Sequence, residues 1–102
     1  MLVKLAFVAP TEDEQQYMVS IDLLELPREG DRISFSRVSE SGSEDFIVRE
    51  VRWNLAFNDT LDKGEVLDVW VTCEFAETFS SKESHKSLCA KFKERTGVHH
   101  QF

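Results

Sequence analysis

Hydrophobic and polar residues alternate along most of the first 75 positions, and this period of two predicts five β-strands. They cover residues 2–8, 17–25, 32–38, 46–57 and 66–75. Pro27 and Gly30 predict a turn before the third strand, because Pro cannot donate a ladder hydrogen bond and Gly readily takes a positive φ. Polar segments at residues 39–45 and 58–65 predict the tips between the later strands.

The fourth predicted strand contains a break in its alternation. Phe46 and Val48 share one register, whereas Val51 and the apolar residues after it share the other. A β-bulge near Arg49-Glu50 would restore one continuous apolar face, because a bulge adds one residue to one strand of a pair. We therefore expect a single long strand with a bulge at this point.

A helix is predicted after the last strand. Ser80-Ser81-Lys82-Glu83 matches a capping box, in which a Ser side chain bonds the amide three residues on and the Glu side chain reaches back. Leu88, Cys89 and Phe92 recur at helical spacing, and Gly97 is suited to the position just beyond the last turn. The apolar stripe is narrow, so we expect the helix to pack against the sheet along one side.

Together these elements predict a mainly β fold of the β-rich α+β class. The expected architecture is a five-stranded antiparallel, highly twisted sheet or small barrel with one C-terminal helix. We assign residues 1–78 to the sheet or barrel, residues 79–97 to a helix packed on the same domain, and residues 98–102 to a tail.

One stretch of the chain has the layout of a known class of fold. The order Gly30-Asp31-x-Ile33, a variable hairpin tip, and then Phe46-x-Val48-x-x-Val51-x-Trp53 resembles small SH3-like β-barrels. The chain is also similar to short uncharacterised prokaryotic or phage proteins that carry a Leu-Pro-x-x-Gly-Asp turn. The resemblance covers residues 26–75 and implies a fold type but no activity, because such barrels host many unrelated functions.

The composition narrows the class of protein. A chain of 102 residues fits one domain, and no apolar run approaches the ~18 residues that a membrane-spanning helix needs. The apolar run at the N-terminus stops at Ala9-Pro10 and acidic residues follow, which is not the pattern of a signal peptide. Two cysteines do not make a disulfide framework. We expect a cytoplasmic protein with no membrane partner.

Charge is distributed unevenly along the chain, whose formal net charge is -7. Residues 1–81 carry seven basic and seventeen acidic residues, whereas residues 82–102 carry five basic and two acidic ones. An acidic body repels duplex phosphates, so general DNA coating is disfavoured. The basic segment is typical of the solvated face of a helix, with contact to nucleic acid or to an acidic partner as the alternative.

Two candidate chemistries involve histidine and cysteine. His85 and Cys89 lie one helical turn apart, and His99-His100 follow. Histidine and cysteine are the side chains that commonly bind zinc, but the sequence has no Cys-x-x-Cys motif to accompany them. Cys73 alternates with apolar residues, which is the pattern of a core thiol, and no oxyanion donor or phosphate loop accompanies either cysteine. We expect no enzyme activity, no catalytic residue, no metal and no cofactor.

The candidate partner-binding residues are aromatic and basic. Trp70 falls in the register opposite to the apolar stripe of its strand, and Arg and Trp are enriched in binding hot spots. The other candidate partner-binding residues are Arg28, Arg32, Arg37 and Arg52. Together with Arg49 they lie near one hairpin. The alternative interpretation is that Trp70 covers a second small core under the helix and that the arginines pair with neighbouring acids.

Three hypotheses for function follow. The first is a non-enzymatic protein-interaction module, either a homodimer or a subunit of a larger assembly, because a reactive site is missing while aromatic and strand-edge surfaces are available. The second is a nucleic-acid-binding barrel that stacks bases on Trp53 and Trp70. The third is an acidic body that imitates nucleic acid. We adopt the first, with the partner protein unidentified.

Overall fold

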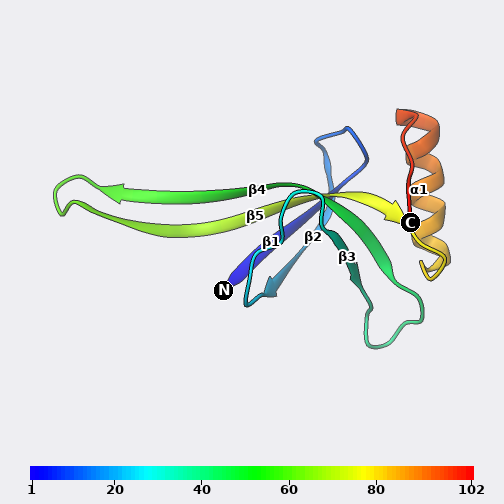
Figure 1. Cartoon of the computed structure of the whole chain (residues 1–102), viewed down its shortest axis with the longest axis horizontal. Helices are drawn as coiled ribbons and strands as arrows, with labels where there is room; N and C mark the ends of the chain where they lie inside the picture. The colour runs from blue at the N-terminus through cyan, green and yellow to red at the C-terminus, as the bar shows by residue number, and fades with distance from the viewer.

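The computed structural model describes residues 1–102 and contains six strands and one helix (Figure 1). These are β1 (Leu2–Val8), β2 (Gln15–Asp22), β3 (Arg32–Phe35), β4 (Glu44–Asn58), β5 (Lys63–Glu77), α1 (Glu83–Thr96) and β6 (His100–Gln101). The prediction of a mainly β fold with one C-terminal helix is confirmed. The second and third strands are shorter than predicted and the fourth and fifth are longer, while the last residues form β6 instead of a loose tail.

The sheet is mixed, so the prediction of purely antiparallel pairing is wrong in this respect. Its order is β2-β1-β5-β4-β3, with β6 attached to β5. β1 runs parallel to β5, with Leu5 opposite Val71, and β6 is also parallel to β5. A parallel pair needs a long connection, and the segment from β2 to β4 provides one. Alternation marks the buried face of each strand but does not identify its neighbour.

The five main strands curl into a half-barrel whose concave face holds the core. Phe7, Phe46 and Phe75 are fully buried at its centre, with the rings of Phe7 and Phe46 stacked at 3.9 Å between centroids. The remaining core side chains of the strands are mostly valine and leucine at alternate positions of β1, β4 and β5. Alternation therefore identified the buried face of these three strands correctly.

α1 covers the end of the concave face where β5 finishes. Phe92 meets Phe75 edge-on at 4.9 Å, and the His85 ring stacks on Phe75 at 5.0 Å. The helix ends as predicted at Gly97, whose φ is 76° and whose N–H donates to the Lys93 carbonyl. This helix is too short and too polar to cross a membrane.

The predicted capping box at the start of α1 is wrong. The N-cap position belongs to Lys82, which makes no side-chain capping bond. The Ser81 hydroxyl instead donates to the carboxylate of Asp45, on β4. The capping box does not form because a buried carboxylate is a stronger hydrogen-bond partner for a hydroxyl than an exposed helix amide is.

The bulge predicted near Arg49-Glu50 is confirmed by a shift in the pairing of β4 with β5 between Val48 and Glu50. Arg49 is the extra residue. Its Nε donates to Glu74 at 2.6 Å, and its two terminal nitrogens donate to the carboxylate of Asp13 at 3.0 Å and to the carbonyl of Glu12 at 2.6 Å. The bulge thus turns one arginine so that it ties β4 to β5 and to the β1–β2 loop.

Beyond the half-barrel, β4 and β5 continue as a two-stranded ribbon, which we call the arm and define as residues 53–69 (Figure 1). β3 pairs with β4 only over Glu44–Ile47, and β1 pairs with β5 only over Trp70–Glu74. Neither long strand therefore has an outer neighbour in the arm. The molecule is elongated as a result, with extents of 52 × 31 × 19 Å and with the arm and α1 at opposite ends.

Replacing Arg49 with Ala should lower the free energy of unfolding by about 2–4 kcal/mol, because Glu74 would stay largely buried after losing its main cationic partner. Urea denaturation measures the loss. Arg52→Ala is the matched control on the same strand, since that side chain is 68% exposed and should change stability by less than about 0.5 kcal/mol. Equal losses for the two variants would refute the structural role of the bulged arginine.

Candidate functional site

Two of the residues predicted to bind a partner lie side by side. Arg52 and Trp70 are cross-strand partners on β4 and β5, and both line a hollow of about 400 Å³ on the convex face of the sheet. The Lys4 ammonium lies 5.1 Å from the centre of the Trp70 ring, a cation–π distance. Trp70 is therefore partly covered by its own sheet.

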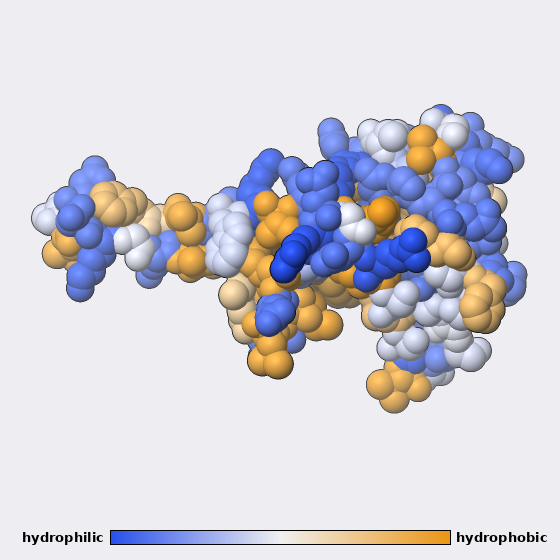
Figure 2. Space-filling model, in the orientation of Figure 1, coloured by the Kyte–Doolittle hydropathy of each residue, from blue (hydrophilic) through white to orange (hydrophobic).

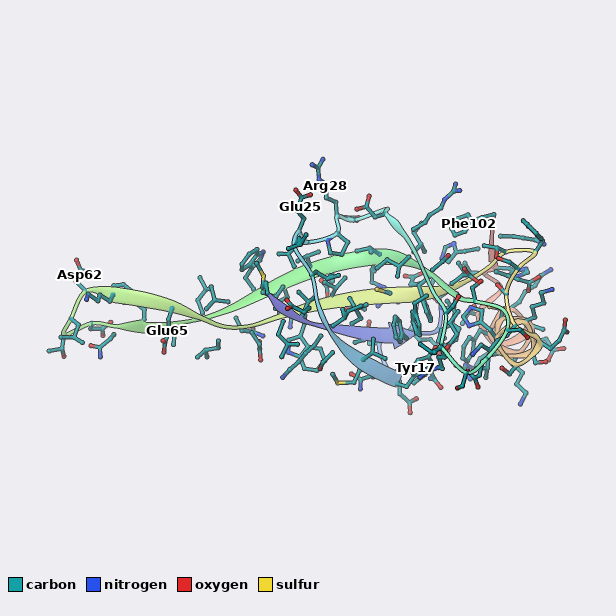
Figure 3. All side chains as sticks on the ribbon, turned by 90° about the horizontal axis from the view of Figure 1, so that it is seen from below. Tyr17, Glu25, Arg28, Asp62, Glu65 and Phe102 are labelled. Atoms are coloured by element: carbon teal, nitrogen blue, oxygen red, sulfur yellow. The ribbon has the colours of Figure 1, made fainter.

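The other three predicted arginines are dispersed. Arg28 lies on the connection between β2 and β3, where Figure 3 shows it beside Glu25. Arg32 stacks on the Phe102 ring at 4.0 Å, and Arg37 donates to Glu44 at 2.8 Å. The arginines do not form one basic surface. Ion pairing with neighbouring acids, the alternative interpretation, describes Arg37, Arg49 and Arg52.

Hydroxyl side chains meet a carboxylate near the start of α1, and two members of this cluster, Ser43 and Asp45, come from residues 39–45, which the sequence predicts as a tip. Asp45 is buried and accepts hydrogen bonds from four hydroxyls, which belong to Ser34, Ser43, Thr78 and Ser81. Burial alone would raise the pKa of Asp45, but these hydroxyl donors lower it. The hydroxyls are committed to one carboxylate, so the cluster fastens the segments around β3, β4 and α1 together.

A second buried carboxylate lies next to this cluster. Glu44 accepts from the Tyr17 hydroxyl at 2.6 Å, from Arg37 at 2.8 Å and from Lys82 at 3.2 Å. Burial would raise the pKa of Glu44, yet the three donors outweigh it and hold that pKa at about 2. Burial and the adjoining Glu44 charge raise the pKa of Tyr17. This site joins β2, β4 and the start of α1 through charge.

Of the groups considered as metal ligands or nucleophiles, His85 and the two thiols are buried, whereas His99 and His100 are only partly buried beside Glu77 and Glu74. His85 Nε2 lies 2.8 Å from the Ala76 carbonyl, 3.0 Å from the Asp45 carbonyl and 3.2 Å from the Asp45 amide nitrogen, so the main chain surrounds this ring nitrogen. Cys89 Sγ contacts the same Ala76 oxygen at 3.6 Å. Burial raises the pKa of Cys73 and of Cys89 to about 12, which leaves both thiols protonated at neutral pH.

The arm exposes a large apolar surface. Figure 2 shows apolar side chains along it, and six of them are between 48% and 65% exposed. They are Trp53, Leu55, Phe57, Leu61, Val66 and Leu67. Trp53, Leu55 and Phe57 continue the alternate positions that begin in the core at Val51, so the arm carries the core-facing side of β4 into solvent. The exposed apolar area is on the order of 600 Å², at the upper end for a monomer.

An open apolar groove lies where the half-barrel fails to close. β2 and β3 are the two edges of the sheet, and a cleft of about 590 Å³ opens beside them. Its main apolar side chains are Leu5, Val19, Ile21, Leu23, Ile33 and Phe35. We call it the seam cleft. Sequence analysis missed the arm and this cleft, because alternation marks an apolar face whether or not another element covers it.

Comparison of the chain with protein-family models, with curated proteins and with solved structures found no match.

Lowering the pH should destabilise the protein through Glu44. The folded state holds this carboxyl at a pKa of about 2, below the ordinary value of 4.5, so its contribution is complete above pH 4.5 and is lost as the pH falls toward 2. We expect the free energy of unfolding to fall by about 3 kcal/mol across this window from Glu44 alone. Urea denaturation at a series of pH values measures the slope.

The Glu44→Gln variant should show a flatter dependence on pH in that window, because it has no proton to bind there. Glu83→Gln is the control, since the Glu83 side chain is 93% exposed and its removal should leave the slope as it is in the original protein. A Glu44→Gln variant with an unchanged slope would contradict the assignment.

Proposed function

We propose that this protein is a non-enzymatic assembly module that binds another protein chain through the arm, and that the first partner is a second copy of itself. The observation that carries the proposal is that the ribbon of residues 53–69 displays six large apolar side chains that are between 48% and 65% exposed and has no strand on its outer edges. Monomeric proteins rarely leave such a surface free, and surfaces of this kind mark interaction sites.

The energetics are adequate for association. Covering about 600 Å² of apolar surface at about 25 cal/mol per Å² contributes roughly 15 kcal/mol before costs. Association costs an estimated 4–15 kcal/mol in lost motion and ordering. The arm is already a paired hairpin, which reduces the ordering cost, so the apolar area is large enough to offset the cost of association. A ribbon with two free edges also offers main-chain hydrogen bonds to a partner strand.

The polar chemistry of the chain supports a non-enzymatic role. The hydroxyls near Asp45 are held by that carboxylate, and the thiols of Cys73 and Cys89 are protonated in the core. Both sets of groups contribute to the fold, which leaves the apolar surfaces as the part of the molecule available to a partner. The half-barrel with one helix also keeps the SH3-like resemblance as part of the proposal, because one added strand at the seam would extend it toward a closed barrel.

The nucleic-acid alternatives have less support. Binding to phosphates needs gathered basic side chains, whereas the arginines are spread over separate places on the molecule. An acidic mimic needs free carboxylates gathered on one surface, whereas Glu12, Glu44 and Glu74 are each bound to an arginine, and Glu25 and Asp62, which are in no ion pair, lie far apart (Figure 3). A protein partner that covers apolar surface accounts for more of what the arm exposes.

Charging the arm should abolish association. The double variant L55E/F57E places two carboxylates on side chains that are more than 60% exposed, so the fold should survive while the interface becomes unfavourable. Light scattering after size-exclusion chromatography, over a range of concentrations, should show oligomers for the original protein and monomers for the variant. Far-ultraviolet circular dichroism checks that the sheet remains.

The double variant V38E/F79E is the matched control. It makes the same change of chemistry and charge at two almost fully exposed side chains outside the arm, so it should associate like the original protein. A protein that is monomeric at every concentration would refute self-association. Equal loss of association in both double variants would show that net charge, and not the arm, controls it.

A further inference from the structure

We propose that the seam cleft of one copy receives the arm of the next copy, so that the chains associate head to tail. This inference rests on the proposed self-association and identifies its second surface. The arm carries six exposed apolar side chains, and the seam cleft is an open groove lined by apolar side chains of which Ile21 is the exposed one, so one contact between copies covers both.

A chain cannot fill its own cleft with its own arm. The arm is the direct continuation of β4 and β5, and it extends from the half-barrel away from the body (Figure 1). Asp62 lies at the far tip, and Figure 3 places it well away from Glu25, which lines the cleft on the β2–β3 connection. The occupant must come from another molecule.

The two surfaces match in length and in period. On β2 and the residue that follows it, Val19, Ile21 and Leu23 supply every second side chain of the cleft wall. The three residues span about 13 Å at about 3.3 Å per residue. On the arm, Trp53, Leu55 and Phe57 have the same spacing and the same length. An arm strand laid along β2 can thus place three large apolar side chains against three others.

Free strand edges are available on both sides of this contact. β2 and β3 are the outermost strands of the sheet, and β4 has no outer neighbour in the arm. An incoming strand can therefore add main-chain hydrogen bonds to the edge while its side chains enter the cleft, which is the usual mode of strand addition. Backbone pairing gives the contact a direction and a register that apolar contact alone lacks.

Area favours this arrangement over pairing of two arms. A standard protein interface buries about 800 Å² per partner, somewhat more than the ~600 Å² that the arm displays. Pairing two arms would cover the arms and leave the seam cleft in water. Placing each arm in a cleft covers both surfaces of every copy. Because the two surfaces differ, the contact is heterologous, and repeating it gives a ring or a filament.

A mixing experiment tests the proposal. The arm variant L55E/F57E keeps its cleft, and the cleft variant I21E keeps its arm; Ile21 is 38% exposed in the cleft wall, so the charge is tolerated in the free chain. Each variant alone should be monomeric, with association weakened at least about tenfold. An equimolar mixture should form a one-to-one heterodimer that grows no further, seen by sedimentation velocity.

The outcomes separate this inference from the proposed function. Oligomers of the original protein together with normal association of I21E would overturn head-to-tail contact while leaving the arm as the interface. Association in neither the original protein nor the mixture would overturn both. A mixture that stays monomeric, although the original protein associates, also refutes complementarity of the two surfaces.

Cross-linking tests the same contact without depending on how I21E folds. Variants L55C and I21C each place one reactive thiol at an exposed position, while the native thiols are buried and protonated. Under mild oxidation the mixture should give a disulfide-linked heterodimer, and L55C alone should give little product. Efficient linkage of L55C to itself, with no linkage to I21C, would establish pairing of arms and overturn the proposal.

Discussion

Unequal strand length within one sheet governs this structure. β4 and β5 have fifteen residues each, whereas β1 has seven and β3 has four. The short strands cover only the part of the long hairpin nearest α1, so the rest projects as the arm. The sheet also ends at short edge strands that do not pair with each other, so the half-barrel keeps an open seam. The exposed ribbon and the uncovered cleft thus have one cause.

The two ends of the molecule use different interactions. At the end covered by α1, the buried carboxylates of Glu44 and Asp45 collect donors from several elements, and aromatic rings fill the space between strands and helix. The buried polar groups at this end therefore find their hydrogen-bond partners within the chain itself. At the arm, apolar side chains continue the core pattern with no element to cover them. This difference locates the proposed interface at the arm and at the seam.

Head-to-tail contact follows from the same asymmetry. A protein whose projecting surface and receiving surface are different patches of one chain builds a repeating structure, because every added copy presents a new free arm or a new free cleft. Strand addition suits such a structure, since the main chain supplies most of the hydrogen bonds and the alternate side chains supply the fit. The half-barrel then acts as a rigid support for both surfaces.

The sequence by itself determined the features that depend on residues close together in the chain. Alternation located all five main strands, the break after Val48 revealed the bulge, and Gly97 marked the end of the helix. Only the tertiary structure decided what depends on remote residues. The parallel pairing of β1 with β5, the burial of Asp45 and the dispersal of the arginines each involve partners distant in the chain. An apolar stripe has the same period whether it is covered or bare, so the arm and the seam cleft became visible only when the strands were placed in space.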